Sequence, residues 1–237
     1  MSFTFKQFIV QQDRCAMKVC TDACIFGAWV ANKMDRGETV PRHILDIGSG
    51  TGLLSLMLAQ KSTAEIDAVE IDADAASQSK ENIEGSPWKE KIRVINVSVT
   101  EFAKDKKYDL IISNPPFFED QLASPDVKKN TAMHSTSLTL KELAVTVKEL
   151  LSPAGKAAIL LPYDRKEFFE EILNNLPLYI NEIVNLSHSR SHKAFRRFMF
   201  ISNENKSSPE REMIIKDNTG EYTPEFIFLL KDYYRDL

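Results

Sequence analysis

Several residue types are scarce in this 237-residue chain, and each shortage excludes a class of protein. The three cysteines are odd in number and match no zinc spacing, which excludes a disulfide scaffold and suits a reducing cytoplasm. No apolar run approaches the roughly 18 residues that a membrane span needs, and polar residues from Gln11 onward come too soon for a signal peptide. We therefore expect a cytoplasmic protein that binds no membrane.

Charge is also low, with a formal net charge of −4, which at first argues against a nucleic-acid partner. Net charge hides local asymmetry, however, because residues 188–197 contain four Lys or Arg, two His and no acid. A solvated face and a nucleic-acid contact explain this run equally well when it is taken alone.

From residue 43 onward, short β-rich runs alternate with helical patterns, and this alternation indicates βαβ units with a parallel sheet covered on both faces. The expected strands are 43–47, 65–70, 92–97, 108–113, 156–161, 179–186 and 196–202. The expected helices are 53–60, 74–83, 140–151 and a short one from Pro224.

The link between the last two strands, residues 187–195, lacks a helical pattern, so we expect the last strand to run antiparallel and close the sheet. The predicted fold class is therefore α/β, with a seven-stranded, mostly parallel sheet. Residues 1–40 precede the first strand and contain the apolar helical stretch Ala23–Ala31. We interpret them as an extension packed on one domain, residues 41–237.

Glycine is scarce as well, yet three of the eight glycines, Gly48, Gly50 and Gly52, fall within five consecutive residues directly after an expected strand. Backbone without side chains approaches a ligand closely at such a turn. Leu53 stands where a dinucleotide fingerprint has its third glycine, and Asp46 in the strand end would repel a pyrophosphate. The loop therefore favours a nucleoside that carries no pyrophosphate.

The second expected strand ends in Glu70, followed by Ile71, and an acid there can accept hydrogen bonds from both ribose hydroxyls. Together with the glycine loop, this acid resembles the S-adenosylmethionine site of class I methyltransferases. The resemblance implies a Rossmann-like fold and S-adenosyl-L-methionine as cofactor. It also implies cofactor-binding roles for Asp46, Gly48, Gly50, Gly52, Glu70, Ile71 and Asn114. A nucleotide-dependent oxidoreductase on the same fold is the more distant alternative.

The expected strand 108–113 runs directly into Asn114-Pro115-Pro116-Phe117. The prolines stiffen a support for an exposed amide and an aromatic ring. The motif resembles that of amino methyltransferases acting on planar nitrogens. The resemblance implies that the Asn114 amide oxygen and the Pro115 carbonyl each accept one N–H of the target amine, while Phe117 stacks on the base. This chemistry needs no metal, which suits a chain with only four histidines.

Further segments carry a resemblance to the bacterial tRNA1(Val) adenine-37 N6-methyltransferase family. They are residues 3–8, 14–23, 86–88, 114–118 and 222–226. The implied activity is N6 methylation of adenosine 37 in the anticodon loop of tRNA1(Val). Guanine N2 of rRNA and a protein glutamine amide remain alternative acceptors, and a non-catalytic RNA-binding module is a further alternative.

The same resemblance implies that Thr21 and Asp22 face the methionine end of the cofactor, although both also suit an N-cap for a helix from Ala23. Ser98 stands where the family commonly has an acid that contacts the adenine amine of the cofactor, and a serine hydroxyl can still accept that hydrogen bond. Cys20 replaces a usual glycine. If the substrate is tRNA, phosphate contacts must come from local basic residues. The candidates are Arg14, Lys18, Arg190, Lys193, Arg196 and Arg197, the last also suited to packing along a strand edge. The sequence leaves the oligomeric state open and is compatible with a monomer.

Overall fold

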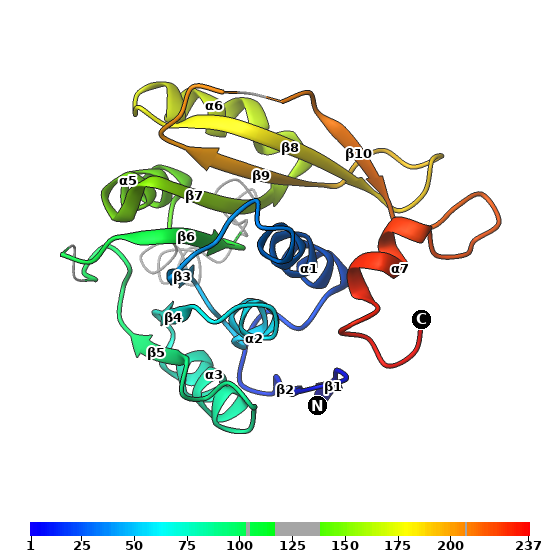
Figure 1. The fold of residues 1–237 in the computed structure, drawn as a ribbon, viewed down its shortest axis with the longest axis horizontal. Helices are drawn as coiled ribbons and strands as arrows, with labels where there is room; N and C mark the ends of the chain where they lie inside the picture. The colour runs from blue at the N-terminus through cyan, green and yellow to red at the C-terminus, as the bar shows by residue number, and fades with distance from the viewer. Residues whose placement is uncertain (103–104, 117–137, 207) are drawn as a thin grey trace, which may run out of the picture.

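An eight-stranded sheet forms the centre of the described part of the chain, residues 1–102, 105–116, 138–206 and 208–237 of a computed structural model (Figure 1). From edge to edge the strands are β10 (Arg211–Ile214), β8 (Tyr179–Ser187), β9 (Arg196–Ser202), β7 (Leu151–Pro162), β6 (Tyr108–Ser113), β3 (His43–Ile47), β4 (Glu65–Glu70) and β5 (Ile92–Asn96). β9 is antiparallel to both its neighbours, and the other pairs are parallel. The expected fold class is therefore confirmed.

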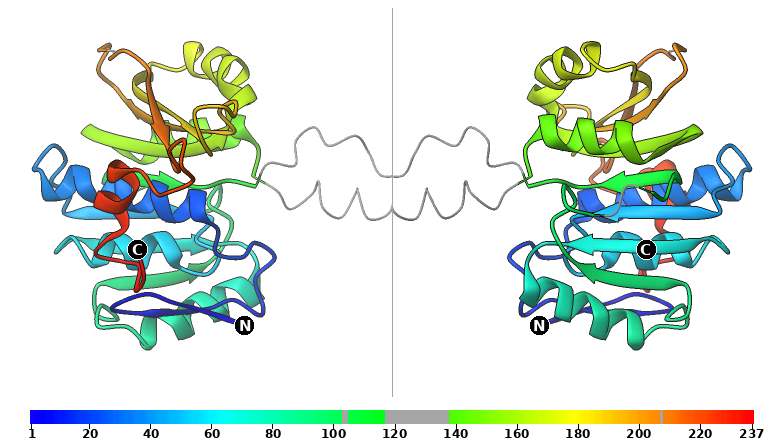
Figure 2. Two further views of the ribbon diagram at one scale, coloured as in Figure 1. Left: turned by 90° about the vertical axis from the view of Figure 1, so that its right-hand side faces the viewer. Right: turned by 90° about the vertical axis from the view of Figure 1, so that its left-hand side faces the viewer.

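Helices cover both faces of this sheet (Figures 1 and 2). One face carries α1 (Thr21–Asp35), α2 (Leu53–Ala59), α3 (Ala73–Glu84), α7 (Pro224–Leu230) and the small hairpin of β1 (Ser2–Thr4) and β2 (Ile9–Gln11). The other face carries α5 (Leu140–Leu150) and α6 (Lys166–Asn174). A 3₁₀ turn, η1 (Tyr163–Arg165), connects β7 to α6. Strand alternation produces the two cores: Ile44 and Ile112 face the first set of helices, whereas Leu45 and Ile111 face the second.

The sheet has one strand more than the seven expected, and the antiparallel strand β9 is not an edge strand. β9 lies between β7 and β8 because its residues Phe198 to Ile201 are buried on both faces, as an interior strand requires. The edge position belongs to β10, a four-residue strand paired in parallel with β8. Such a short strand carries too little pattern to be predicted, and neither α6 nor the β1–β2 hairpin was expected.

The carboxyl ends of the parallel strands meet along one edge of the sheet. Ile47 pairs with both Val69 and Ser113, and Ser113 also pairs with Ile159. The loops that follow β3, β4 and β6 are therefore neighbours. Because β9 runs the opposite way, its first residue pairs with the last residue of β7, so the β8–β9 hairpin loop reaches the same edge. The residues predicted to carry the chemistry thus share one side of the molecule.

Candidate functional site

The glycine loop follows β3 and lies at the edge of the sheet where the parallel strands end. Gly48, Gly50 and Gly52 all have positive φ (70°, 53° and 79°), a conformation that L side chains rarely adopt. A Cβ added at Gly48 or Gly50 would meet nothing within 4 Å, so both face open space, whereas one at Gly52 would lie 2.7 Å from the Ser79 hydroxyl. The first two glycines therefore leave room for a ligand, and the third permits close packing against α3.

Glu70 holds the loop from the next strand. Its carboxylate accepts hydrogen bonds from the backbone N–H of Gly50 (2.8 Å) and of Asp72 (2.9 Å), and the residue is buried. These two amides fix the carboxylate against the loop, and each carboxylate oxygen keeps a further lone pair for a hydroxyl donor. The geometry therefore fits the ribose contact expected of Glu70.

Asp46 lies beneath the loop and is fully buried. One carboxylate oxygen, Oδ2, accepts hydrogen bonds from the Ser55 hydroxyl (2.7 Å) and backbone N–H (3.1 Å), which ties β3 to α2. Its other oxygen, Oδ1, is buried and accepts no hydrogen bond from any residue in the described ranges. Burial raises the pKa of Asp46 to about 7, although the Ser55 hydrogen bonds oppose the shift.

A cavity of about 310 Å³ opens beside the loop, at the ends of β3, β4 and β5. Its apolar walls include Ile47, Val69, Ile71 and Val97, and Ser98 adds a hydroxyl, which is within 2.8 Å of the Thr100 hydroxyl. Ile71 is 49% exposed, so its side chain is accessible to a ligand in the cavity. The lining also includes Glu101 and Glu142, so the cavity offers a base both aliphatic walls and carboxylate acceptors, and Val69 and Ile71 in its wall flank the carboxylate that suits the ribose.

Asn114 begins the loop after β6. Ser113 anchors the strand end by donating its hydroxyl to the Ile47 carbonyl (2.9 Å), and Pro115 is buried. The Asn114 Nδ2 group contacts the Met17 sulfur at 3.7 Å, but its Oδ1 is buried and accepts no hydrogen bond within the described residues. Phe117 lies outside those residues. A buried amide oxygen without a donor is costly, so the site favours a ligand that brings an N–H.

Thr21 and Asp22 form the first turn of α1, whose N-cap is Cys20. The predicted helix start at Ala23, with Thr21 or Asp22 as its cap, is therefore wrong by two residues. Asp22 instead accepts a hydrogen bond from Arg196 Nε at 2.7 Å in an ion pair. This pair joins the start of α1 to the start of β9 at the site edge.

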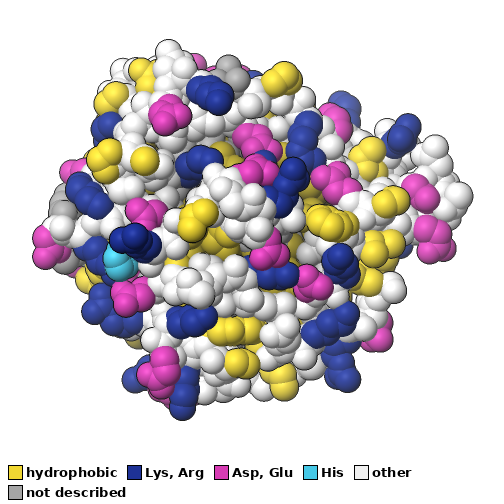
Figure 3. Space-filling model, viewed as in Figure 1, with side chains coloured by type: hydrophobic (Ala, Val, Ile, Leu, Met, Phe, Trp, Pro, Cys, Tyr) yellow, Lys and Arg dark blue, Asp and Glu magenta, His cyan; other side chains and the backbone are white. Residues whose placement is uncertain are grey.

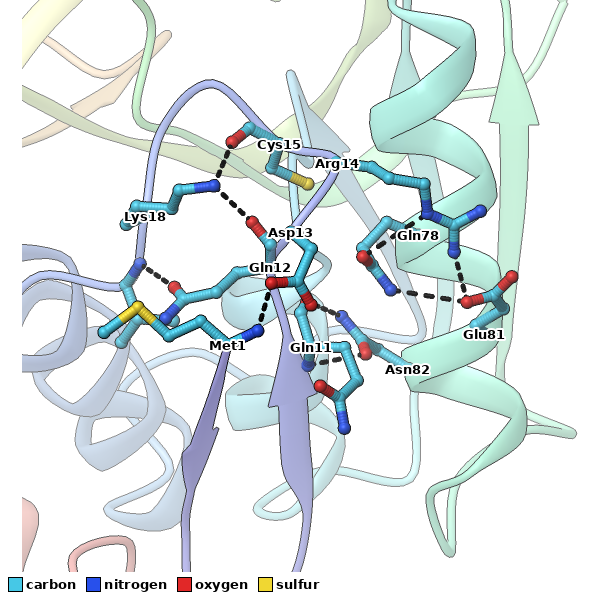
Figure 4. A network of polar contacts seen from close by, with 11 residues as sticks. Met1, Gln11, Gln12, Asp13, Arg14, Cys15, Lys18, Gln78, Glu81 and Asn82 are labelled. Carbon is cyan, nitrogen blue, oxygen red and sulfur yellow. Dashed lines mark hydrogen bonds and ion pairs between the residues drawn. The ribbon is translucent and has the colours of Figure 1, made fainter.

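Two of the predicted RNA-binding cations hold the N-terminal segment in place (Figure 4). Arg14 pairs with Glu81 on α3. It also donates to the Ser77 hydroxyl at 3.2 Å. Lys18 donates to the backbone carbonyls of Gln12 (2.5 Å) and Cys15 (2.8 Å). Both charges therefore have partners within the chain.

The other four cations lie on or beside the β8–β9 hairpin loop. Arg190 and Lys193 are exposed, and Arg196 is half-buried against the Phe195 ring, 5.5 Å from its centroid. Arg197 differs, because its side chain is only 4% exposed and donates from Nε to Asn185 at 2.7 Å. A guanidinium buried in this way does not present its charge to an RNA phosphate.

Neither a metal site nor a membrane span is found among the described residues. Within them, no group of three or more His, Cys, Asp and Glu side chains is placed to hold a metal ion. Likewise, no helix in these ranges has the length and apolar character to cross a membrane.

Comparison with known proteins first defines the class. The methyltransferase small domain family matches residues 27–144. A predicted O-methyltransferase from Agrobacterium tumefaciens has the same fold, with a TM-score of 0.69 at 16% identity over 91% of this chain and 99% of that one. Ribosomal protein L11 methylase from Lactobacillus delbrueckii has a TM-score of 0.53 at 16% identity, over 76% and 77% of the two chains. The chain therefore has the Rossmann-like fold of class I methyltransferases.

Curated relatives then define the family. The tRNA1(Val) (adenine(37)-N6)-methyltransferase of Dyadobacter fermentans is 45% identical over 98% of this chain and 96% of its own length. The Parabacteroides distasonis protein of the same name is 38% identical over 98% and 97%. This chain belongs to the tRNA1(Val) (adenine(37)-N6)-methyltransferase family, which confirms the resemblance seen in the sequence.

Met17 and Ser55 were not among the predicted site residues, although they contact Asn114 and Asp46. Met17 is 97 residues from Asn114 in the chain, and no local pattern announces such a contact. Ser55 carried a weak signal, since a hydroxyl in the apolar run 53–59 needs a partner when buried.

Proposed function

We propose that this protein methylates N6 of adenosine 37 in tRNA1(Val), with S-adenosyl-L-methionine as methyl donor. The observation that carries the proposal is the buried Oδ1 of Asn114, an acceptor without a donor among the described residues, at the carboxyl end of β6. Family membership supports the choice of acceptor, because the curated relatives are named for this reaction.

The residues around the loop fit the cofactor in three parts. Glu70 is placed to accept the ribose hydroxyls, and the cavity lined by Ile71 and Ser98 suits the adenine ring. The open faces of Gly48 and Gly50 leave space for the amino-acid portion, toward which Thr21 and Asp22 are proposed to point. When bound, S-adenosylmethionine supplies a methyl group activated by a sulfonium sulfur.

The chain's own contribution to the reaction is orientation. The exocyclic amine of adenine is a poor nucleophile because its lone pair is delocalised into the ring. Asn114 Oδ1 would accept one N–H and the Pro115 carbonyl the other, which holds the nitrogen with its lone pair directed toward the methyl donor. Orientation of this kind lowers a barrier by several kcal/mol, up to about 7–11 in the best cases. Phe117 is proposed to stack on the adenine, which must leave its own stack to enter.

The exposed Arg190 and Lys193 are the principal candidates for phosphate contacts, because they share the sheet edge with Asn114. Arg14, Lys18 and Arg196 are proposed as supplements, each after exchange of a partner within the chain. Arg197 is left out of this surface because it is buried. Basic and acidic side chains are interspersed over the face in Figure 3, so a local contact of this kind is compatible with a negative net charge.

The proposal is tested with purified protein, labelled cofactor and two unmodified tRNA1(Val) transcripts, one with adenosine and one with guanosine at position 37. We expect label and N6-methyladenosine, identified by nucleoside mass spectrometry, in the first transcript alone. Parallel reactions with ribosomal RNA and with a protein fraction test the alternative acceptors. Incorporation confined to either of them would contradict the proposal, and tight NAD binding without S-adenosylmethionine binding would favour an oxidoreductase.

A further inference from the structure

Tyr163 is an exposed aromatic residue at the same sheet edge as Asn114. It follows β7, the neighbour of β6, and 40% of its surface is exposed. From the register of Ser113 with Ile159, Tyr163 lies about three residues, or about 10 Å, beyond Asn114 along the strand direction. A nucleotide next to the target adenosine would therefore reach it.

A buried cation supports the Tyr163 ring from beneath. The Arg197 guanidinium carbon lies 4.2 Å from the ring centroid, and its side chain is only 4% exposed. Its Nη2 is 3.8 Å from Glu210, whereas its Nη1 is buried and has no hydrogen-bond partner among the described residues. Arg197 Nε also donates to Asn185 on β8 (2.7 Å), so β8 fixes the guanidinium and the guanidinium in turn fixes the Tyr163 ring.

The surroundings of the ring suit nucleic acid. The Tyr163 backbone N–H donates to the Phe195 carbonyl (3.2 Å), which ties η1 to the basic hairpin loop that carries Arg190 and Lys193. Within that loop, the His188 ring stacks on Phe195 at 4.1 Å with an interplanar angle of 4°. Aromatic rings beside basic residues are the recurring arrangement for binding unpaired bases.

We propose that Tyr163 is a stacking platform for a nucleotide that flanks the target adenosine, with Arg197 as the positioning residue that holds the ring. The inference rests on the proposed function, since it concerns the same RNA. The ligand is an unpaired base, which lies against the exposed part of the ring while the guanidinium occupies the inner face. Arg197 thus acts through Tyr163 and does not contact RNA itself.

The test measures binding of a synthetic anticodon stem–loop RNA to the full-length protein. Tyr163→Ala is expected to raise the RNA Kd about tenfold, the size of one base–aromatic stack, and to leave the cofactor Kd unchanged. Tyr163→Phe is expected to stay within about twofold of wild type. Tyr179 is the matched control, because it is 37% exposed on the same sheet. It is the first residue of β8 and pairs with Ser202, so it lies at the end of the strands opposite to Asn114. Tyr179→Ala should bind RNA as wild type does.

Two further arms separate stacking from folding. Tyr163→Leu keeps an apolar cover over Arg197 without an aromatic face, so it should lose as much RNA affinity as Tyr163→Ala. Two further RNAs, each with an abasic site on one side of the adenosine, identify the base that stacks on Tyr163. For one of them, the Kd of the wild-type protein should rise about tenfold. The Kd of Tyr163→Ala should be the same for that RNA as for the intact RNA. Wild-type binding by Tyr163→Ala or Tyr163→Leu, or equal losses on every RNA, would overturn the inference. In those cases wild type would still methylate the RNA, whereas failure of the proposed function would abolish methylation in wild type too.

Discussion

Two buried carboxylates on neighbouring strands have opposite surroundings. Asp67 on β4 accepts hydrogen bonds from Tyr108 (2.6 Å), Lys106 (2.9 Å) and Arg93 (3.0 Å). Within the described residues, Asp46 on β3 accepts hydrogen bonds from Ser55 alone, and one of its oxygens has no donor. Burial raises the pKa of both, but the three donors outweigh it at Asp67 and lower its pKa overall.

The difference shows where this sheet is complete without a ligand and where it is not. The cluster around Asp67 satisfies its own charges, so it stabilises the fold. The loop edge keeps buried oxygens without donors among the described residues, at Asp46 and Asn114, and such atoms are costly unless something else pairs with them. A substitution at Asp67 should therefore lower stability, and one at Asn114 should lower activity.

The largest expected effect is that of Asn114→Ala on methyl transfer. Loss of one oriented acceptor should reduce the single-turnover rate by about 10²–10³, by analogy with other preorganised hydrogen bonds at reaction centres. Thermal unfolding and cofactor binding should change little, because the amide oxygen has no partner to lose among the described residues. A variant that methylates at the wild-type rate would exclude the proposed role.

Asp67→Ala should lower the stability of the fold and change the methylation rate little beyond what the loss of folded protein explains. It leaves the Tyr108 hydroxyl without its acceptor, so we expect a loss of about 1–3 kcal/mol in the free energy of unfolding. Lys106 and Arg93 are partly exposed and turn to solvent, which limits the loss. Urea unfolding measures it, and Tyr108→Phe is the control for the single hydrogen bond. A drop in methylation without a drop in stability would contradict the comparison.

The two carboxylates should also give opposite pH dependence. The raised pKa of Asp46 means that the folded state keeps a proton that the unfolded state releases near its ordinary pKa of about 3.9. The stability this group contributes is therefore present below about pH 4 and is lost as pH rises through about 7. The free energy of unfolding of Asp46→Asn, relative to that of wild type, should therefore increase as the pH rises over this range, by at most about 1.4 kcal/mol for each pH unit.

Asp67→Asn is the matched control for that experiment. Its lowered pKa means that the stability it contributes is present above the unfolded pKa and is lost as the pH falls through the folded value. The gap between wild type and Asp67→Asn should therefore shrink as the solution is acidified. Parallel curves for the two variants would show that the surroundings do not distinguish them.

The smallest expected effects concern surface charge. Replacing Arg190 and Lys193 by alanine should weaken tRNA binding and make log K less steeply dependent on log salt. The slope should fall by up to about 0.9 for each phosphate that the variant no longer neutralises. Arg14→Ala should change this slope less, because its charge is paired with Glu81 on α3. An equal change from Arg14→Ala would show that the N-terminal segment contributes to the RNA surface.

Much of this architecture follows from local sequence. The alternation of strand and helix patterns predicts β3, β4, β6 and β9 at the residues the structure gives them, because strands buried on both faces leave long apolar runs. The glycine cluster, Glu70 and Asn114 are each local signals at strand ends, and parallel topology alone brings such ends together. Their cofactor and catalytic roles remain predictions.

Tertiary structure decided what depends on distant partners. The sequence suggests that Arg197 packs along a strand edge, but no pattern in it shows that the residue is buried under Tyr163. The sequence also does not show that three side chains donate hydrogen bonds to Asp67, whereas a single described residue, Ser55, donates to Asp46. Local sequence determines backbone geometry and which faces are apolar, because those depend on neighbouring residues. The pairing of a buried charge can depend on side chains tens of residues away, as it does at Asp67, and only the packed fold brings them together.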